Sequence, residues 1–560
     1  MVVTPAQLRE LVLAAKLIDA QAFDDSQKIS DSTGRSLFTT LEERGLATNE
    51  QLGRLEATFL KLPFVVLSKT PITEDVFNTI PERLARKLRV VVFARDPQVI
   101  KLAMANPFQK EIPEMIAKKT GQKIEIYYAT KTDVQNCLQL FKRDLQKSVD
   151  IMLAEDIGLP QGTTDDPPVA KIVDLLLDTA YEEKASDVHI EPQEDHSIIR
   201  FRLDGMLHLV LKVSKYLHDR VLTRIKVLSN LRTDEHLSAQ DGKMKVQMGE
   251  ERLDIRVSII PIADGEKAVL RLLSSRARQF TLTDLGMTQT DLDKVNRAFT
   301  KSFGMILSTG PTGSGKTTSI YSILKIINTP EKNITTVEDP VEYRIMGANQ
   351  IQVNAKTNLT FANGLRSILR QDPNIIFVGE IRDSETAGIA VNAALTGHLV
   401  LSTLHTNDAA TALPRLTDMK VEPFLVASTV TVIIAQRLVR KNCEHCKTAA
   451  KITVTDLEKN FPADIIKRNF SKTAAVTVFK GQGCKVCRNS GYSGRIGLFE
   501  VLEVTPRIRK LIVEKADSDI IAKAAIDEGM KTMVDDGLSK ITQGVTTLEE
   551  VLRVTKAEFV

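Results

Sequence analysis

Residues 310–317 read Gly-Pro-Thr-Gly-Ser-Gly-Lys-Thr, which has the spacing Gly-x-x-x-x-Gly-Lys-Thr. A mostly apolar run, 303–308, precedes this stretch, and residues 317–327 follow it with the apolar spacing of a helix. A strand, a glycine-rich turn and a helix in this order make the pattern specific for a phosphate-binding loop. A chance glycine-rich turn is the alternative, and the flanking elements argue against it. The stretch therefore predicts a multidomain chain with an α/β P-loop domain built on a parallel sheet.

The residue types of this loop suit the binding of a nucleotide. Glycines let backbone N–H groups close around phosphate oxygens, and the N-terminus of the following helix favours an anion. Lys316 is expected to reach the β- and γ-phosphates, and the Thr317 hydroxyl to bind Mg²⁺. The loop alone does not specify ATP. The predicted nucleotide-binding residues are Gly310, Pro311, Thr312, Gly313, Ser314, Gly315, Lys316, Thr317 and Thr318.

Two predicted strands downstream of the loop end in carboxylates. The buried-type run 374–378 leads into Gly379 and Glu380, and the run 333–337 leads into Glu338. Glu380 is expected to hold Mg²⁺, directly or through water, and Glu338 to polarise the attacking water. Each carboxylate alone would more often be a surface charge. Two such strand ends, in the order expected after a phosphate loop, favour catalytic roles.

A third segment, 397–408, places His398 and His405 on either side of an apolar strand. A lone histidine is usually structural. Two histidines that bracket a central strand suit a role in sensing the γ-phosphate or in linking subunits. His398 is therefore included among the candidate catalytic residues.

The composition limits the possible partners and location. The chain has 560 residues, 43% apolar and 26% charged, with a net charge of +4. At roughly 150 residues per domain this length suggests about three or four domains. The nearly neutral charge gives no reason to expect nucleic acid or an acidic lipid surface as the main partner.

Residues 1–18 lack the features of a signal peptide. The longest apolar runs, such as 430–435, fall far short of the ~20 residues that span a bilayer. A cytosolic protein without direct membrane insertion is expected, and any membrane role would come through a partner.

Changes in pattern along the chain predict three folded regions joined by linkers. The region before the P-loop domain combines a helical segment with alternating segments typical of antiparallel strands, which indicates an α+β domain. The run 158–168 is rich in Gly, Pro and small polar residues, as linkers are. The predicted divisions are 1–150 (small N-terminal α/β domain), 151–168 (linker), 169–275 (α+β domain), 276–292 (linker) and 293–560 (P-loop domain with a cysteine-bearing element, 443–487, and a helical part, 500–560).

Four of the five cysteines form two Cys-x-x-Cys pairs, Cys443 with Cys446 and Cys484 with Cys487. Two such pairs are the usual ligands of a closed, structural zinc site, and disulfides are the alternative, disfavoured in a reducing cytosol. His445 is expected to be a bystander. Four-cysteine elements also occur in nucleic-acid binders, but residues 447–483 show no dense basic and aromatic stripe. Cys137 has no partner in sequence and is expected to be a buried apolar side chain.

Six segments together resemble the ATPases of type IV pilus assembly and type II secretion, the PilB and GspE branch of the secretion ATPases. Segments 185–192 and 200–205 of the α+β region look like that family's signature segments. The resemblance runs from about residue 168 to 560 and covers the N-terminal region only loosely. The four P-loop-domain motifs are the Walker A loop 310–318, the aspartate box 334–342, the atypical Walker B segment 372–383 and the histidine box 396–408.

The resemblance implies an enzyme that converts ATP and water to ADP and phosphate and couples the reaction to movement. It also implies a RecA-like fold for the P-loop domain and a homo-hexameric ring with nucleotide between subunits. The α+β domain is implied to be PAS-like, with arginines that reach the bound phosphates. The matching positions are Arg202, Arg256 and Arg271. A guanidinium can offset charge on the transferring phosphoryl group. For each of the three, an ordinary strand-surface arginine is the alternative.

The four-cysteine element helps to decide which secretion or pilus machine the ATPase drives. Pilus-assembly and type II secretion ATPases carry such an element, whereas pilus-retraction ATPases generally lack it and are shorter. The resemblance therefore implies a motor for type IV pilus assembly, recruited to the inner face of the cell membrane by a platform protein and cytoplasmic-face assembly proteins. A type II secretion ATPase is the alternative. A DNA-transfer motor and a nucleotide-binding regulator that does not hydrolyse ATP are further hypotheses.

Residues 60–67 and the segment from Ile80 onward resemble the family's N-terminal domain. Some relatives bind cyclic di-GMP there through an Arg-Leu-Gly start. In this chain Ser36 and Phe38 stand where that Arg and Gly would be. Because the guanidinium is missing, cyclic di-GMP is not expected as a ligand, and docking to the membrane platform partner is the expected role.

Overall fold

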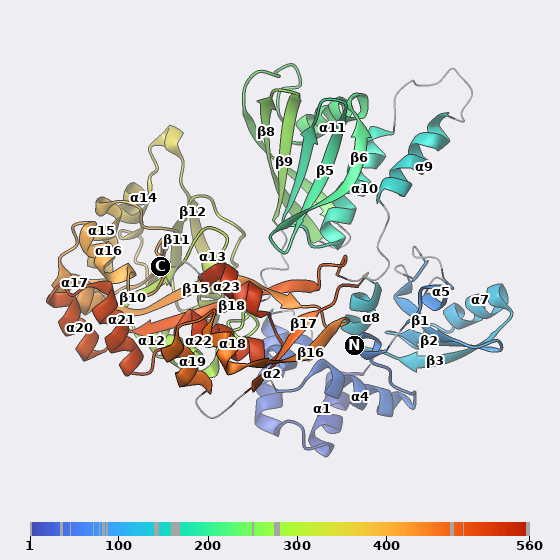
Figure 1. Ribbon diagram of the computed structural model, residues 1–560, viewed down its shortest axis with the longest axis horizontal. Helices are drawn as coiled ribbons and strands as arrows, with labels where there is room; N and C mark the ends of the chain where they lie inside the picture. Colours follow the sequence, from blue (N-terminus) through green and yellow to red (C-terminus); the bar gives the residue numbers. More distant parts are fainter. Residues whose placement is uncertain are drawn as a thin grey trace. The chain divides into compact units, whose positions relative to one another are not determined.

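The computed structural model divides into two compact units, Met1–Ile151 and Met152–Val560, which are described separately (Figure 1). Ser36, residues 158–167 of the first predicted linker and residues 276–279 at the start of the second lie outside the described part of the chain. The structure describes residues 3–33, 37–44, 46–70, 72–77, 79–80, 84–85, 88–138, 145–157, 168–248, 251–273, 280–470, 475–484 and 487–555.

The first unit begins with four helices around a small apolar core that includes Leu8, Phe23 and Leu52. Their bounds are α1 (Pro5–Ala14), α2 (Ala20–Thr33), α3 (Leu37–Glu43) and α4 (Asn49–Leu60). Thr4 and Thr48 each accept a hydrogen bond from the backbone N–H three residues on and so fix the starts of α1 and α4.

A three-stranded sheet forms the second half of this unit. Strand β2 pairs antiparallel with β1 and parallel with β3, and helix α7 makes the crossover. Cys137 lies in the core beside this sheet, as expected from the sequence, and burial raises the pKa of its thiol to about 12. The elements are η1 (Leu67–Lys69), α5 (Glu74–Phe77), β1 (Val90–Arg95), β2 (Val99–Met104), α7 (Glu111–Thr120), β3 (Lys123–Tyr128), α8 (Lys131–Leu138) and α9 (Leu145–Ile157).

Helix α9 continues to Ile157, so the first half of the predicted linker 151–168 is helical. The second predicted linker, 276–292, also contributes to a folded part: Leu282 and Met287 are buried in the core of the P-loop domain, and α12 begins at Gln289.

The second unit begins with a six-stranded antiparallel sheet, in the order β6-β5-β4-β9-β8-β7. Helices α10 and α11 pack against each other and use their apolar faces, for example Ile172 and Val221, to form the core beside it. The elements are α10 (Val169–Glu182), β4 (Asp187–Pro192), β5 (His196–Leu203), β6 (Met206–Ser214), α11 (Lys215–Leu228), β7 (Gln240–Met248), β8 (Glu251–Ile262) and β9 (Gly265–Leu273).

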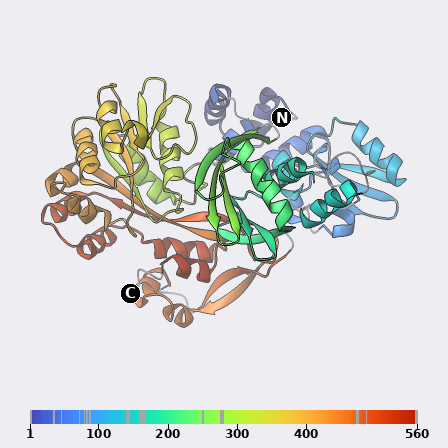
Figure 2. The same ribbon diagram turned by 90° about the horizontal axis from the view of Figure 1, so that it is seen from above.

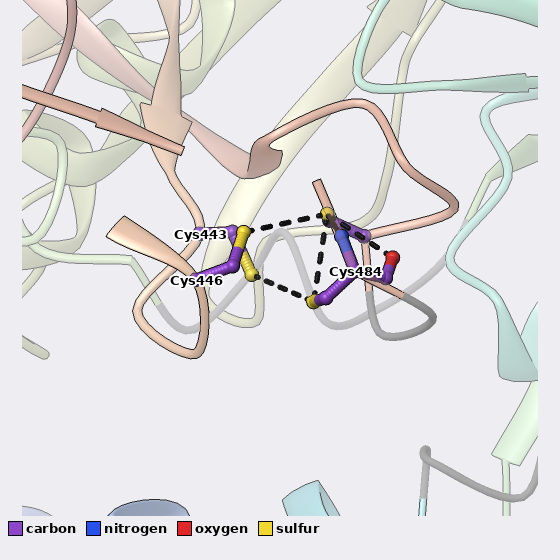
Figure 3. A group of neighbouring side chains, drawn as sticks. Cys443, Cys446 and Cys484 are labelled. Carbon is purple, nitrogen blue, oxygen red and sulfur yellow. Dashed lines mark hydrogen bonds between the residues drawn. The ribbon is translucent and has the colours of Figure 1, made fainter. Parts of the chain in front are cut away.

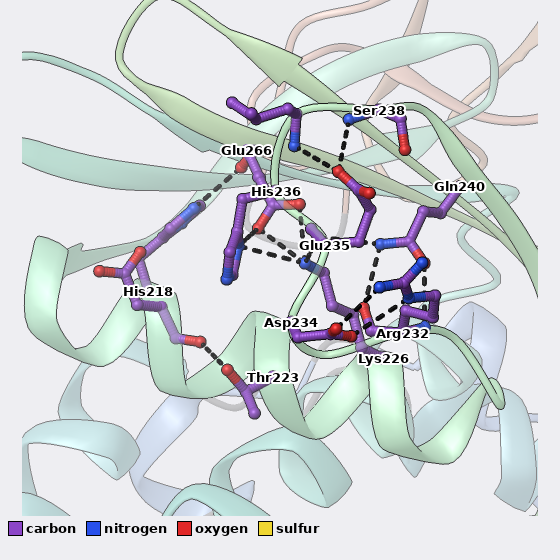
Figure 4. A network of polar contacts seen from close by, with 12 residues as sticks. His218, Thr223, Lys226, Arg232, Asp234, Glu235, His236, Ser238, Gln240 and Glu266 are labelled. Carbon is purple, nitrogen blue, oxygen red and sulfur yellow. Dashed lines mark hydrogen bonds and ion pairs between the residues drawn. The ribbon is translucent and has the colours of Figure 1, made fainter.

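A polar network fixes the long loop between α11 and β7 (Figure 4). Lys226 is only 1% exposed, and its ammonium lies 2.8 Å from a Glu266 carboxylate oxygen and donates to the Glu235 carbonyl at 2.7 Å. His236 Nδ1 lies 2.8 Å from the same Glu266 carboxylate. A buried lysine is tolerated when it is paired in this way, so the network is a structural tie between the loop and β9.

The P-loop domain is built on a seven-stranded sheet in the order β12-β11-β13-β14-β10-β15-β18. The first six strands are parallel, and β18 runs antiparallel to β15. The two cores contain alternate residues of β10: Met305 and Leu307 belong to one, Ile306 to the other. Since successive side chains of a strand point to opposite faces, the sheet is covered on both sides, and the predicted RecA-like parallel-sheet fold is confirmed.

The strands of this sheet are β10 (Gly304–Thr309), β11 (Ile334–Glu338), β12 (Ala348–Gln352), β13 (Ile375–Val378), β14 (Leu399–Leu404), β15 (Val430–Asn442) and β18 (Tyr492–Glu503). The helices of this part are α12 (Gln289–Phe299), α13 (Lys316–Ile327), η3 (Ala355–Thr357), α14 (Phe361–Ile368), α15 (Ser384–Leu395), α16 (Ala412–Asp418), α17 (Pro423–Thr429), α18 (Val454–Glu458), α19 (Ala463–Phe470), α20 (Pro506–Val513), α21 (Ser518–Asp527), α22 (Met533–Thr542) and α23 (Leu548–Thr555). The hairpin of β16 (Lys447–Thr453) and β17 (Ala475–Gly481) extends from this domain as a two-stranded ribbon (Figure 2).

Within the described part of the chain, no helix is both long and apolar enough to cross a bilayer.

Glu550 on α23 joins the helical C-terminal part to strand β15. Its carboxylate lies 2.7 Å from the Arg440 guanidinium and 2.8 Å from that of Arg553, and it accepts a further bond from the Arg440 backbone N–H at 2.9 Å. Burial alone would raise the pKa of Glu550, but these hydrogen bonds outweigh it and lower the pKa to about 2. The carboxylate is 2% exposed, so it is a buried ion pair with its hydrogen bonds satisfied.

Glu550→Gln should lower the free energy of unfolding by roughly 2 kcal/mol at neutral pH, the worth of a charged hydrogen bond. Because the folded pKa lies below the ordinary value of 4.5, this stability is present above that value and disappears as the pH falls towards 2. Urea unfolding at several pH values measures the difference. Glu549→Gln, a neighbouring exposed carboxylate paired with Lys480, is the control and should have little effect. An equal loss for Glu550→Gln at pH 7 and pH 3 would contradict the assigned ion pair.

Candidate active site

The phosphate loop lies between the end of β10 and the start of α13, where the sequence predicted it. Gly310, Gly313 and Gly315 have φ angles of 144°, 78° and 92°, which disfavour residues with a Cβ. A Cβ on Gly310 would also lie 2.5 Å from the backbone oxygen of Gln436. Glycine is therefore required by both backbone conformation and close packing.

The polar groups of the loop converge on its interior. Lys316 is 8% exposed, and its ammonium donates to the carbonyls of Gly310 at 2.8 Å and Pro311 at 3.1 Å. Burial lowers the pKa of Lys316, and the nearby charge of Glu380 opposes that effect. The Ser314 hydroxyl is buried and has no hydrogen-bond partner among the described residues. Thr317 and Thr318 are half-buried in the first turn of α13. A buried cation, an unsatisfied hydroxyl and a glycine backbone in one turn fit a phosphate group.

Glu380 follows β13 and Gly379 at the carboxyl edge of the sheet. Its side chain is mostly buried and lies 2.5 Å from the Arg382 guanidinium and 3.3 Å from His405 Nε2. Its electrostatic effect on Lys316 places it within range of the phosphate loop. The predicted magnesium-binding residues Thr317 and Glu380 thus come from two neighbouring parts of one sheet edge.

The two histidines of the segment 397–408 lie at opposite ends of β14. His405 follows the carboxyl end and reaches Glu380, whereas His398 precedes the amino end, where its Nδ1 lies 2.9 Å from the Ala393 carbonyl oxygen. Six residues of extended strand separate them by about 20 Å. Within one chain, the structure brings His405 to the candidate site and does not bring His398 there.

Glu338, the last residue of β11, lies in a buried hydrogen-bonded cluster. Its carboxylate is 2% exposed and accepts from the hydroxyl of Thr336 at 2.5 Å, the amide of Gln350 at 3.1 Å and the hydroxyl of Tyr321 on α13. Burial raises the pKa of Glu338, although these three donors partly offset the effect. The neighbouring charge of Glu342 raises the pKa further. Burial favours the protonated form of this carboxyl group, so the group binds a proton more readily than an exposed glutamate.

The three predicted arginines lie in one row across the antiparallel sheet. Register pairs Arg256 with Arg271, Arg271 with Asp187, and Asp187 with Arg202, and Lys243 extends the row beyond Arg256. Residues opposite each other on adjacent strands share a face. A hollow of about 440 Å³ on this face is lined by Lys243, Arg256 and Arg271, among others.

All three arginines have partners in the structure. Asp187 lies 2.9 Å from Arg271 Nε and 3.3 Å from Arg202 Nε. Arg256 donates to the carbonyl of Val341, in the segment directly after Glu338, at 3.0 Å, and lies 3.6 Å from Glu342. The row therefore carries concentrated positive charge that is partly neutralised by acidic neighbours.

The four cysteine sulfurs gather at the ends of β15 and of the β16–β17 hairpin (Figure 3). The sulfurs of Cys443 and Cys484 are 3.9 Å apart, those of Cys446 and Cys487 3.8 Å, and those of Cys484 and Cys487 3.7 Å. A tetrahedral zinc–thiolate site with ~2.3 Å bonds places its sulfurs about 3.8 Å apart. The arrangement fits a zinc ion, and all four cysteines are free thiols rather than disulfides.

Backbone amides prepare one of these thiols for metal binding. The N–H groups of Cys484 and Gly491 point at the Cys487 sulfur at 3.1 and 3.2 Å. Burial opposes ionisation, but these bonds outweigh it and lower the pKa of Cys487 to about 7. Amide donors of this kind stabilise a thiolate, the form that binds metal.

Sequence reasoning missed several residues at the site. Tyr321 and Gln350 hold Glu338, Asp187 pairs two arginines, and Gln436 lies against the phosphate loop. The alternation of buried strands gives no signal for these partners. Tyr321 had a weak signal in the sequence, because it lies on α13, the helix that directly follows the phosphate loop.

Comparison with known proteins identifies the family. The sequence model of the type II/IV secretion system protein family matches residues 162–553, and that of the MshEN domain matches residues 60–147. The chain therefore belongs to the type II/IV secretion system protein family, and the predicted resemblance is confirmed.

Individual relatives cover nearly the whole chain. The type IV pilus assembly ATPase PilB of Myxococcus xanthus is 36% identical over 562 residues, 98% of each chain. PilB of Pseudomonas aeruginosa is 38% identical over 563 residues, again 98% of each. A putative type II secretion system protein E of Escherichia coli is 43% identical over 423 residues, covering 75% of this chain and 84% of the relative.

Among solved structures, the ATPase DotB of Legionella pneumophila superposes with a TM-score of 0.52 at 22% identity, covering 71% of this chain and 98% of that one. At this identity the likeness shows a shared fold, consistent with the parallel sheet and its phosphate loop.

Proposed function

We propose that this chain is an ATPase motor that hydrolyses ATP to drive type IV pilus assembly. One observation carries the enzymatic part: the phosphate loop, Glu380 and Glu338 all lie at the carboxyl ends of strands in one parallel sheet. That edge is where such sheets bind their ligands. The assembly function is supported by relatives named as pilus assembly ATPases that match over 98% of both chains.

Different residues of the site have different roles in the transfer of the phosphoryl group to water. The loop N–H groups and Lys316 bind the β- and γ-phosphates, and Lys316 offsets the charge that develops on them. Thr317 and Glu380 would hold Mg²⁺, which would neutralise phosphate charge. Glu338 orients the attacking water and accepts its proton, a role that a raised pKa favours. His405, beside Glu380, is better placed than His398 to respond to the γ-phosphate.

The row of Arg202, Arg256 and Arg271 supplies further positive charge to the bound nucleotide in a homo-hexameric ring. Movement of the α+β domain would bring these guanidinium groups to the phosphates or withdraw them, which links hydrolysis to rotation. Because Asp187 pairs with Arg271 and Arg202, phosphate would compete with this carboxylate for the arginines.

The ring acts at the cytoplasmic face of the inner membrane, through a platform protein and cytoplasmic-face assembly proteins. The N-terminal region docks to this machinery without inserting into the bilayer. Phe38 lies in α3, at a position where cyclic di-GMP binders of the family have glycine, and cyclic di-GMP is not proposed as a ligand. Nucleic acid is not proposed as a partner either.

The second candidate is a type II secretion ATPase. The observation that favours it is the higher identity, 43–44%, of type II secretion proteins over 70–75% of this chain. Since motor chemistry is common to both machines, the choice depends on partners.

Glu338→Gln should retain nucleotide binding yet reduce turnover by at least about a hundredfold, since an amide cannot accept the water's proton. Mg²⁺-ATP turnover is measured on the size-exclusion peak of determined mass, with Lys316→Ala, which should weaken binding, beside it. Turnover of Glu338→Gln equal to that of the wild type would remove Glu338 from its role.

Deletion of the gene should abolish surface pili while secretion of enzymes through the outer membrane continues, and the wild-type gene, but not Glu338→Gln, should restore pili. Electron microscopy of pili and assay of secreted enzymes measure the two outcomes. Loss of secretion with pili intact would favour the type II secretion alternative.

Cys484→Ser should remove bound zinc and lower the melting temperature, because metal binding to the four thiolates contributes directly to stability. Metal analysis and thermal unfolding of the purified protein measure both effects. Cys137→Ser, at the buried thiol of the first unit, is the matched control and should keep its zinc. Full zinc content in Cys484→Ser would contradict the structural zinc site.

A further inference from the structure

Gln436 lies beside the point where β10 becomes the phosphate loop. It belongs to β15, which runs parallel to β10, and its neighbour Ala435 pairs with Thr309, the last residue of β10. The side chain is 2% exposed. A buried amide must find partners for both its ends, so the identity of these partners shows what the residue does.

Both ends of the amide bind the phosphate loop or the helix that follows it. Nε2 donates to the backbone carbonyl of Ser314 at 2.6 Å, and Oε1 accepts from the Ser319 hydroxyl at 2.7 Å. Ser314 and Ser319 are themselves buried. The amide therefore bridges the loop and the second turn of α13 from a strand more than a hundred residues away in sequence.

The backbone of the loop packs directly on the same residue. A Cβ on Gly310 would lie 2.5 Å from the Gln436 backbone oxygen, and one on Gly315 would lie 2.9 Å from Gln436 Nε2. Gln436 is thus in contact with both the first and the last glycine of the loop.

The hydrogen bond from Gln436 to the Ser314 carbonyl also determines which way the neighbouring N–H group points. In a planar trans peptide, the carbonyl and the following N–H point in opposite directions. Holding the Ser314 carbonyl towards β15 therefore turns the Gly315 N–H away from β15. An N–H group at the start of a helix, such as that of Gly315 before α13, is the kind of donor that binds phosphate oxygens.

We propose that Gln436 is a positioning residue for nucleotide binding, which fixes the Ser314–Gly315 peptide so that its N–H faces the phosphates. This inference rests on the proposed function of the loop as an ATP site. Glutamine suits the position because it combines a donor for Ser314 with an acceptor for Ser319. Glutamate would lose the donor, and asparagine is one methylene shorter than the span requires.

The test compares three variants of the full-length protein for ADP and ATP binding by titration calorimetry, for kcat and KM, and for melting temperature. Gln436→Met keeps the length and removes both hydrogen bonds, whereas Ser319→Ala removes only the bond to α13. Thr431→Val is the matched control: it deletes a buried hydrogen bond from the same strand, β15, to the Met305 carbonyl of β10, at the other end of β10 from the loop.

Gln436→Met should weaken nucleotide binding roughly tenfold or more, because the Ser314 carbonyl loses its donor, with kcat at saturating ATP changed much less than KM. Ser319→Ala should show a smaller loss of affinity in the same direction. Thr431→Val should bind as the wild type does, even where its melting temperature falls.

An affinity of Gln436→Met equal to that of the wild type would overturn the inference. A loss of affinity in Thr431→Val as large as that in Gln436→Met would also overturn it, because the effect would then follow stability rather than position. If Gln436→Met does not fold, wild-type affinity in Ser319→Ala overturns the inference and a selective loss supports it. Failure of the wild type itself to bind ATP would instead refute the proposed function.

Discussion

The arrangement of this site depends on one geometric constraint, which is that parallel strands end at the same edge of their sheet. The loop after β10 and the carboxylates after β13 and β11 come from distant parts of the sequence, yet the parallel pairing brings them to one edge. Backbone pairing therefore fixes the spacing of the candidate catalytic groups. The apolar layers on both faces exist to keep that sheet buried and intact.

The charged side chains at this edge of the sheet are paired with neighbouring polar groups. Glu380 lies between the Arg382 guanidinium and the His405 ring, and Lys316 is held by loop carbonyls. A bound nucleotide would exchange these internal partners for phosphate oxygens and a metal ion. Such an exchange costs less than exposing unpaired buried charges, because each group is already desolvated and oriented.

Local patterns made the phosphate loop and the strand-end carboxylates predictable, since their signals lie within about ten residues of sequence. Gln436 was not predictable, because its partners Ser314 and Ser319 are 122 and 117 residues away. Strand β4 has the alternating pattern of a half-buried strand, with Asp187, His189 and Glu191 between apolar residues, yet these three polar side chains are buried as well. The alternation is therefore typical of a strand, but it gives no sign that the polar face is also covered.

Strand β15 connects the phosphate loop with the cysteine cluster. It supports the phosphate loop at Gln436, and seven residues later it delivers Cys443 to the cysteine cluster. At about 3.3 Å per residue, Gln436 and Asn442, the last residue of β15, are roughly 20 Å apart, and the pairing of β15 with β18 shifts register between Arg440 and Asn442. The phosphate loop and the cysteine cluster are thus both anchored on one strand, so a change in the tilt of β15 at one end would act on the other.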